Sequence, residues 1–197
     1  MRLFVAAHPP RAVLDETDRA ERFLRQRLPA LRARFVPARQ RHLTFSFLGE
    51  VADAAVEDVM AAVHGAASAA RPFELRTAGL GAFPGPRRAR VLWLGLSGPT
   101  SDAGDLARDL ASRMLPEVPG DATSGAFVPH VTLARLKGDG GGARPDVGEV
   151  LPAYVAADVP WRITRVSLYA SLLTPEGAQH RVLAHADLGA DDPVERP

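Results

Sequence analysis

Residues 41–49 read RHLTFSFLG, and residues 129–137 repeat the same outline as PHVTLARLK. Each copy places a His and a Thr two positions apart in an apolar run of the kind that forms a β-strand. Successive side chains of a strand point to opposite faces, so the His and the Thr of each copy share one face while the apolar residues beside them point the other way. Two such strands are able to face one another across a cleft.

Composition describes an ordinary globular protein. The chain has 197 residues, which suits one large domain or two small lobes and is ample for a hydrophobic core. Its 46% hydrophobic and 24% charged residues are typical of soluble domains. The sequence has no cysteine, which excludes a disulfide framework, a thiolate zinc site and a thiol nucleophile.

Charge and hydropathy limit where the protein works and what it binds. The net charge is +1, so the protein is not held to nucleic acid by bulk charge, and any RNA contact should be confined to a small site. The apolar run at residues 3–7 is too short for a signal-peptide core, and no later run reaches the roughly 18 apolar residues of a membrane span. We therefore expect a cytoplasmic protein without a membrane anchor, and the sequence gives no reason to expect more than a monomer.

The rest of the sequence alternates between helical and extended patterns. Apolar spacings of three and four residues predict helices over about residues 10–28, from Asp53 (as N-cap) to Ala70, and from about Ser101 to Leu115. The two motif histidines are 130 − 42 = 88 positions apart, and each copy neighbours one of the last two helices. Further β-prone runs lie at residues 3–7, 34–36, 73–77, 90–96, 160–164, 166–173 and about 180–186.

This alternation favours a mixed α/β or α+β fold, which we interpret as two similar lobes. Residues 1–188 then form one two-lobed domain, and residues 189–197 form a polar C-terminal tail that frays. The glycine-rich run at residues 138–142 is interpreted as a linker, because it lacks the sequence context of a phosphate-binding loop.

The paired motif has the residues for metal-free hydrolysis of a phosphodiester. With His42 and His130 on opposite sides of a phosphate, one neutral imidazole can take a proton from water and one imidazolium can give a proton to the leaving oxygen. Thr44 and Thr132 can donate hydroxyl hydrogen bonds to the non-bridging oxygens. A single His-x-Thr strand is more often an ordinary half-buried pair, whereas two copies in distinct halves favour the functional interpretation.

Five blocks of the sequence together resemble the 2H phosphoesterases, and within them the RNA 2′,3′-cyclic phosphodiesterases, also called 2′-5′ RNA ligase-like proteins. The blocks stand in the family's order and extend over nearly the whole chain, to about residue 188. Together they are specific, whereas no single block is. They are residues 2–6, residues 42–45 with 47–51, residues 90–95, residues 129–135 and residues 166–171.

The resemblance implies an α+β fold of two pseudo-symmetric lobes of antiparallel β-sheet, with flanking helices around a central cleft and with neither metal nor cofactor. The family opens a terminal 2′,3′-cyclic phosphate on RNA to leave a 2′-phosphate, so the implied partner is an RNA or oligonucleotide end. On that model His42 is the general acid and His130 the general base, although the near-symmetry of the site leaves the two roles open from this sequence alone. Some members also join or cleave 2′-5′ linked RNA.

Two residues depart from a simple strand pattern or from the family. Arg135 follows Thr132 by an odd number of residues, so in a regular strand it points away from the His and the Thr unless the strand twists or bulges. The resemblance favours a substrate-phosphate role for Arg135, and a surface ion pair is the alternative. His180 stands where relatives often carry a Tyr, which leaves its role open.

Other features have simpler interpretations. The basic cluster of Arg87, Arg88 and Arg90, on a predicted hairpin tip, either guides an RNA backbone or is a solvated loop. His180 and His185 are five apart and should face opposite sides of a strand, and no acidic cluster near them predicts a metal site. Four aromatic residues in apolar strand runs are expected in the core: Phe45, Phe47, Trp93 and Trp161.

Competing functions remain at this stage. A close alternative enzyme acts on a small cyclic nucleotide or a 2′-5′ linkage, and a metal hydrolase is a more distant one that EDTA would inactivate. A non-catalytic nucleotide- or RNA-binding module is the alternative of a different class, against which the two intact motifs argue, because a binder needs no acid and base pair.

Overall fold

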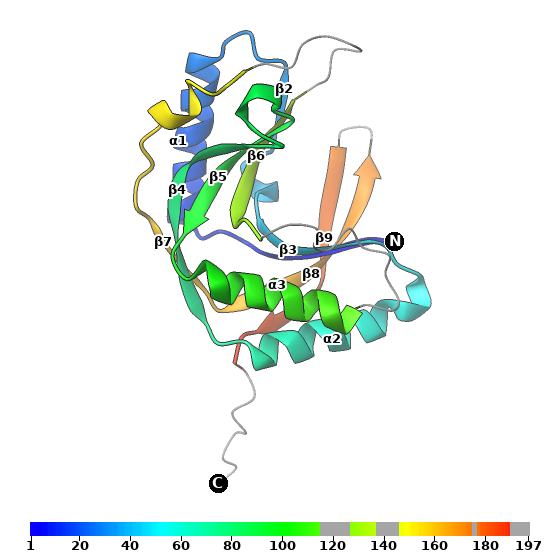
Figure 1. Ribbon diagram of the computed structural model, residues 1–197. Helices are drawn as coiled ribbons and strands as arrows, with labels where there is room; N and C mark the ends of the chain where they lie inside the picture. The colour runs from blue at the N-terminus through cyan, green and yellow to red at the C-terminus, as the bar shows by residue number, and fades with distance from the viewer. Residues whose placement is uncertain (115–126, 137–145, 175–176, 190–197) are drawn as a thin grey trace.

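The computed structural model describes residues 1–114, 127–136, 146–174 and 177–189. These residues form an α+β fold with three α-helices and one curled, antiparallel sheet of nine strands (Figure 1). The strand order is β7-β4-β5-β6-β3-β1-β8-β9, with β2 also paired to β6. The strands are β1 Arg2–Ala7, β2 Ala33–Phe35, β3 Leu43–Glu50, β4 Phe73–Phe83, β5 Val91–Ser97, β6 His130–Leu136, β7 Pro160–Ile163, β8 Arg165–Thr174 and β9 Gly177–Asp187.

The three helices begin and end close to where apolar periodicity predicts them. They are α1 Arg11–Arg27, α2 Val56–Ala69 and α3 Thr100–Met114. The N-cap prediction at Asp53 is wrong, because Asp53–Ala55 forms a short 3-10 turn and α2 begins after Ala55 without a side-chain cap. The predicted glycine-rich linker at residues 138–142 and nearly all of the predicted tail lie outside the described residues.

The two expected halves share one sheet, and the helices pack on it in two buried clusters. Apolar side chains of α2 and α3 pack on β1, β3 and β8 in one buried cluster, whereas α1 packs on β4, β5 and β6 in a second cluster. Strand β6 contributes to both clusters: Val131 of the second His-Thr copy belongs to the first, and Leu133 and Ala134 pack with α1 in the second. Helix α3, which precedes this copy in the sequence, packs mainly on α2 and β3. Helix pairing of this kind depends on tertiary packing, which local periodicity does not encode.

Buried polar groups fix α1 in its place. Glu16 is only 4% exposed, and its carboxylate accepts hydrogen bonds from the Tyr154 hydroxyl at 2.7 Å, the Ala157 N–H at 3.0 Å and the Arg19 guanidinium at 2.8 Å. Burial alone would raise the pKa of Glu16, but the hydrogen bonds from Arg19 and Tyr154 outweigh it and hold the pKa below its usual value. A charged carboxylate thus ties α1 to the segment before β7.

The pairing between β3 and β6 predicts a large contribution of Leu43 to stability. Leu43 pairs with Val131, the one register pair between these strands in the described part of the chain, and both side chains are fully buried. Leu43→Ala should lower the free energy of unfolding by about 2–5 kcal/mol, because a cavity would open where the halves meet. Urea denaturation measures this, with Leu172→Ala on the exposed side of β8 as the control that changes stability by less than about 0.5 kcal/mol. Equal losses in the two variants would contradict the assigned junction.

Candidate active site

The two His-Thr copies lie side by side in the middle of the sheet. Leu43 and Val131 point into the core, so the His and Thr side chains on either side of them share the opposite face. Continuing the antiparallel register by one residue puts His42 beside Thr132 and Thr44 beside His130. The arrangement is close to two-fold symmetric about the Leu43–Val131 pair, and it groups four of the five predicted site residues.

Both histidines are oriented by the same backbone contact. Nδ1 of His42 lies 2.7 Å from the carbonyl oxygen of Gln40, and Nδ1 of His130 lies 2.7 Å from the carbonyl oxygen of Val128. A carbonyl can only accept, so each Nδ1 carries the proton and donates it. Each Nε2 is thereby left available, either to accept a proton when the ring is neutral or to donate one when it is charged.

Aromatic rings pack against the two imidazoles. Phe4 of β1 stacks on His42 with ring centroids 4.9 Å apart, and Phe83 of β4 meets His130 edge-on at 5.0 Å. Burial among these rings is the main cause that lowers the pKa of His42 to about 4. The hydrogen bond to Gln40 opposes this shift, and the positive charges of His180, His8 and Arg135 contribute to it. Burial, and then Arg135, also lowers the pKa of His130. Both rings are therefore neutral near pH 7 in the free protein.

A β-bulge brings Arg135 to the same face as Thr132. On β5, Trp93 pairs with Thr132 but Leu92 pairs with Ala134, so Leu133 is an extra residue on β6. Leu133 and Ala134 are consecutive and both fully buried, as expected where a strand's alternation is interrupted. Arg135 then lies opposite Val91, two residues before Trp93 on β5, and its charge reaches both histidines.

A second bulge exposes Phe47, which the sequence had placed in the core. Ala6 pairs with Thr44, whereas Val5 and Phe4 pair with Ser46 and Phe47, so Phe45 is the extra residue on β3. Phe45 is buried, as predicted, but Phe47 is 61% exposed and shares the face of Thr44. Phe47 therefore occupies the position in its copy that Arg135 occupies in the other. The parallel between residues 42–47 and 130–135 is the sequence signal that identifies it.

The two tryptophans, both expected in the core, differ in their burial. Trp161 is buried as predicted, whereas Trp93 is only half-buried and lies 5.8 Å from the ring of His130. A Cβ atom at Gly81 would lie only 2.1 Å from the Trp93 ring. Any larger residue at position 81 would therefore clash with this ring. Gly81 is a further residue at the site that sequence reasoning missed.

His180 lies beside His42, and its relation to His185 differs from the prediction. The His180 ring meets the His42 ring at 90° with centroids 5.5 Å apart, and its Nδ1 is buried with no hydrogen-bond partner among the described residues. Tyr169 pairs with Val182 while Leu168 pairs with Ala184, so a bulge at Leu183 puts His180 and His185 on one face. The expectation of opposite faces was therefore wrong.

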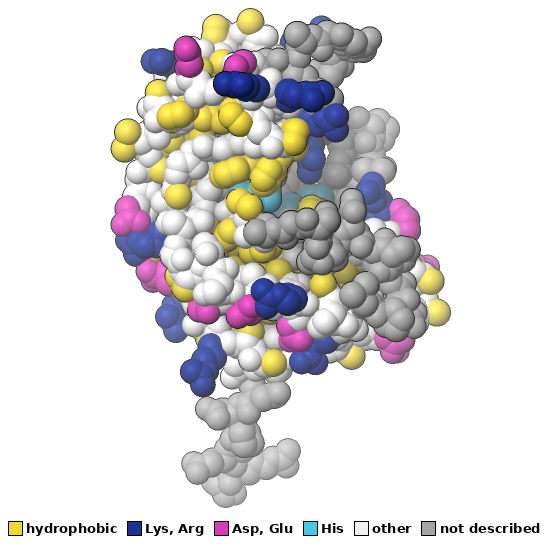
Figure 2. Space-filling view, in the orientation of Figure 1, with side chains coloured by type: hydrophobic (Ala, Val, Ile, Leu, Met, Phe, Trp, Pro, Cys, Tyr) yellow, Lys and Arg dark blue, Asp and Glu magenta, His cyan; other side chains and the backbone are white. Residues whose placement is uncertain are grey.

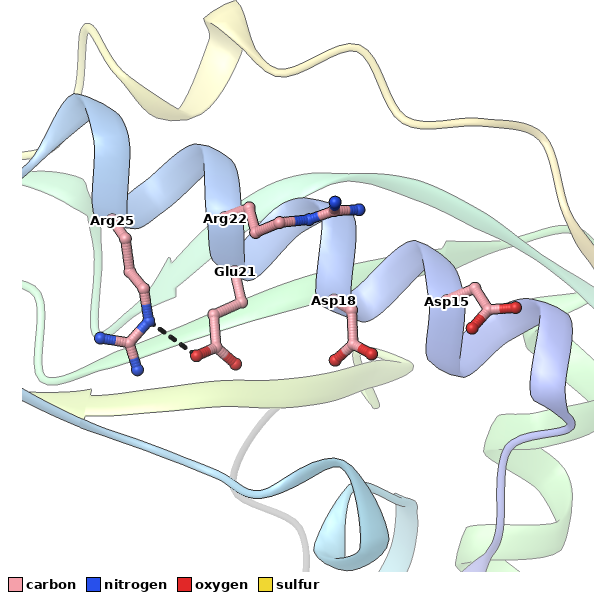
Figure 3. A pocket seen from close by; sticks show the side chains of 5 residues that line it. All are labelled: Asp15, Asp18, Glu21, Arg22 and Arg25. Atoms are coloured by element: carbon pink, nitrogen blue, oxygen red, sulfur yellow. Dashed lines mark hydrogen bonds and ion pairs between the residues drawn. The ribbon is translucent and has the colours of Figure 1, made fainter.

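A buried arginine holds the segment that leads into His42. Arg41 is 2% exposed; its Nε donates to the Val36 carbonyl at 3.0 Å, and its other nitrogens reach Thr17 at 2.7 Å, Asp18 at 2.6 Å and Glu21. Figure 3 shows Asp18 and Glu21 projecting from the same side of α1, together with Asp15. The 3-10 turn Ala38–Gln40, whose last carbonyl orients His42, is thus clamped to α1.

Metal-binding clusters and membrane-spanning helices are both absent from the described ranges. No group of three or more His, Asp or Glu residues in them is arranged to hold a metal ion. None of the helices there combines the length and apolarity needed to cross a membrane.

The site can now be compared with known proteins. A family model described as the 2′-5′ RNA ligase superfamily matches residues 9–174. The chain belongs to this superfamily. An RNA 2′,3′-cyclic phosphodiesterase of Methanothermobacter thermautotrophicus is 30% identical over 178 residues, covering 90% of this chain and 93% of that protein. One of Thermus thermophilus is 32% identical, covering 100% and 98%.

Solved structures share the fold of this chain. A crystal structure of a Thermus thermophilus protein, TT0787, matches with a TM-score of 0.79 and 30% identity, covering 97% of this chain and all of that one. Escherichia coli LigT complexed with 3′-AMP matches with a TM-score of 0.70 at 24% identity, covering 95% and 97%, and shows likeness of fold alone.

The low pKa of His42 predicts how stability depends on pH. Below pH 6.5 the unfolded chain takes up a proton at His42 before the folded protein does, so folding stability should fall as the pH falls from 6.5 to about 4 and level off below that. The loss from this one group is about 3 kcal/mol. Urea denaturation across this window should show a shallower loss in His42→Gln. Parallel curves for the two proteins would contradict the buried, neutral imidazole.

The clamp predicts that Arg41 positions His42. Arg41→Leu should lose about 3 kcal/mol of stability, because Thr17, Asp18 and Glu21 lose a buried partner. In the fraction that remains folded, the pKa of His42 measured by NMR should fall further below its ordinary value, because the hydrogen bond to the Gln40 carbonyl, which raises it, is lost. Arg41→Lys should restore the pKa in part. Arg25→Leu is the matched control, because Arg25 also bonds Glu21, at 2.7 Å, but is exposed. An unmoved His42 pKa would mean that Arg41 is structural only.

Proposed function

We propose that this chain is a metal-independent RNA 2′,3′-cyclic phosphodiesterase that leaves a 2′-phosphomonoester. The observation that carries the proposal is the matched pair of imidazoles on neighbouring strands, each with Nδ1 bound to a backbone carbonyl at 2.7 Å and Nε2 left for proton transfer. Relatives named RNA 2′,3′-cyclic phosphodiesterase, at about 30% identity over most of the chain, support the substrate class.

The reaction requires one proton acceptor and one proton donor. Nε2 of His130 takes a proton from water as the water oxygen bonds to phosphorus, and the bond from phosphorus to the ribose O3′ breaks. Nε2–H of His42 gives its proton to O3′, which leaves as a hydroxyl while the phosphate stays on O2′. Thr44 and Thr132 donate hydrogen bonds to the non-bridging oxygens, and Arg135 offsets the charge that grows on them.

The substrate's own charge supplies the protonation state that the free protein lacks. Burial lowers the pKa of His42 to about 4, so few molecules carry the acid form near pH 7. A phosphodiester anion bound beside His42 favours its charged form and raises that pKa. The acid is therefore charged mainly in the complex, where its proton has an acceptor.

The exposed ring of Phe47 is suited to the terminal base. It shares the face of Thr44 and lies 6.1 Å from Phe4, which in turn stacks on His42. An aromatic face stacks on any base, so this contact supports binding of an RNA end without selecting its sequence.

The test is hydrolysis of an oligoribonucleotide ending in a 2′,3′-cyclic phosphate, with EDTA present. His42→Ala and His130→Ala should each lower kcat by about 10²–10⁴, the usual contribution of a positioned acid or base. His64→Ala, which removes an exposed histidine of α2, is the matched control and should retain the wild-type rate. Phosphorus NMR of the product should show a 2′-phosphate.

Other outcomes identify the alternatives. Loss of activity in EDTA would indicate a metal hydrolase, and tight binding without turnover would indicate a binding module. Joining of a 5′-hydroxyl RNA in place of hydrolysis would indicate 2′-5′ ligation. Turnover that survives both histidine substitutions would overturn the proposed mechanism.

A further inference from the structure

Exposed arginines from separate segments meet at one end of β6. Arg135 pairs directly with Arg34 of β2, and the Leu136 N–H donates to the carbonyl of Arg90 at 2.8 Å. Arg87 and Arg88 lie in the 3-10 turn between β4 and β5, a few residues after Phe83, whose ring contacts His130. We call Arg34, Arg87, Arg88 and Arg90 the arginine strip; it begins just beyond Arg135.

Three of the strip's arginines, Arg87, Arg88 and Arg90, are not paired with an acid among the described residues. Several arginines elsewhere pair with nearby acids, as Arg11 does with Asp15 on α1 and Arg113 with Asp109 on α3. Among the described residues, Arg87, Arg88 and Arg90 make no side-chain hydrogen bond or ion pair, and all three are exposed. Figure 2 shows dark blue side chains gathered beside the hollow in which the histidines are visible.

Like charges at this density favour an anionic ligand. Arg87, Arg88 and Arg90 fall within four positions of the chain and are all exposed, so their like charges repel one another and favour a bound anion. Exposed guanidinium groups bind phosphates in two-pronged fashion and hold a nucleic-acid backbone without reading its bases. A single strand of RNA presents one such phosphate per nucleotide.

We propose that the arginine strip binds the backbone phosphates of the RNA nucleotides that precede the cyclic phosphate, so that the protein favours oligonucleotide ends over cyclic mononucleotides. The inference rests on the proposed function, because it takes the reacting phosphate to lie between His42 and His130. A cyclic mononucleotide carries only that phosphate and cannot reach the strip. The strip is therefore a site for substrate length, separate from the residues that act on the bond.

The experiment compares kcat/KM for 2′,3′-cyclic AMP and for an oligoadenylate with a 2′,3′-cyclic end. The double variant Arg87→Ala/Arg88→Ala should lower the ratio of oligonucleotide to mononucleotide kcat/KM about fivefold, as expected for two lost surface ion contacts. The slope of log kcat/KM for the oligonucleotide against log salt concentration should become shallower by about 0.7 for each arginine removed. The matched control is Arg71→Ala/Arg162→Ala, which removes two exposed arginines near the other end of β4 and should leave the ratio and the slope as in wild type.

The possible failures are distinguishable. Equal kcat/KM for the two substrates in wild type, or an unchanged ratio in the Arg87→Ala/Arg88→Ala variant, would overturn the strip while leaving the phosphodiesterase intact. If wild type hydrolyses neither substrate, the proposed function fails. In that case, fluorescence anisotropy measures the affinity of wild type and of the Arg87→Ala/Arg88→Ala variant for a 2′-phosphorylated oligoadenylate. Weaker binding by the variant would support the arginine strip as a binding site, and equal affinity would overturn it.

Discussion

The pairing of Leu43 with Val131 sets the geometry on which the site depends. It is the one register pair between β3 and β6 in the described chain, and on each strand the paired residue has a histidine before it and a threonine after it. Because both side chains are fully buried, a slip of one residue would expose Leu43 and Val131 and bury the histidines. The free-energy cost of that slip keeps two histidines 88 positions apart on the same face of the sheet.

The same packing that holds the imidazoles also keeps them unprotonated near pH 7 in the free protein. Phe4 and Phe83 give each ring a fixed orientation, and the carbonyls of Gln40 and Val128 fix the proton on Nδ1. Burial then favours the neutral form of both rings. In the mechanism proposed above, the neutral form suits His130 as the base, and His42 becomes charged only when an anion is bound beside it. Protonation of His42 would then be coupled to occupancy of the site.

Most of the fold could be predicted from the sequence, and the errors share a physical cause. The three helices, the main strands and the grouping of the His and Thr residues follow from periodicity, which is a local property of the chain. The errors concern strand faces, because a bulge adds one residue and reverses every face assignment after it. Bulges at Phe45, Leu133 and Leu183 expose Phe47, return Arg135 to the face of Thr132 and align His180 with His185. The packing of α3 on α2 and the burial of Arg41 depend on contacts distant in sequence, which no local pattern shows.

The distribution of arginines explains how a protein of net charge +1 can be suited to a polyanion. Paired arginines on α1 and α3 neutralise acids on their own helices and contribute little field beyond them. Arg41 is neutralised inside the molecule by Asp18 and Glu21. Arg87, Arg88 and Arg90, which pair with no acid among the described residues, lie near the end of β6, and Arg135 of that strand acts electrostatically on both histidines. Positive charge is therefore present beside the site proposed for the phosphate. A chain nearly neutral overall thus avoids nonspecific attraction to nucleic acid along its length while keeping a local attraction at one edge of the site.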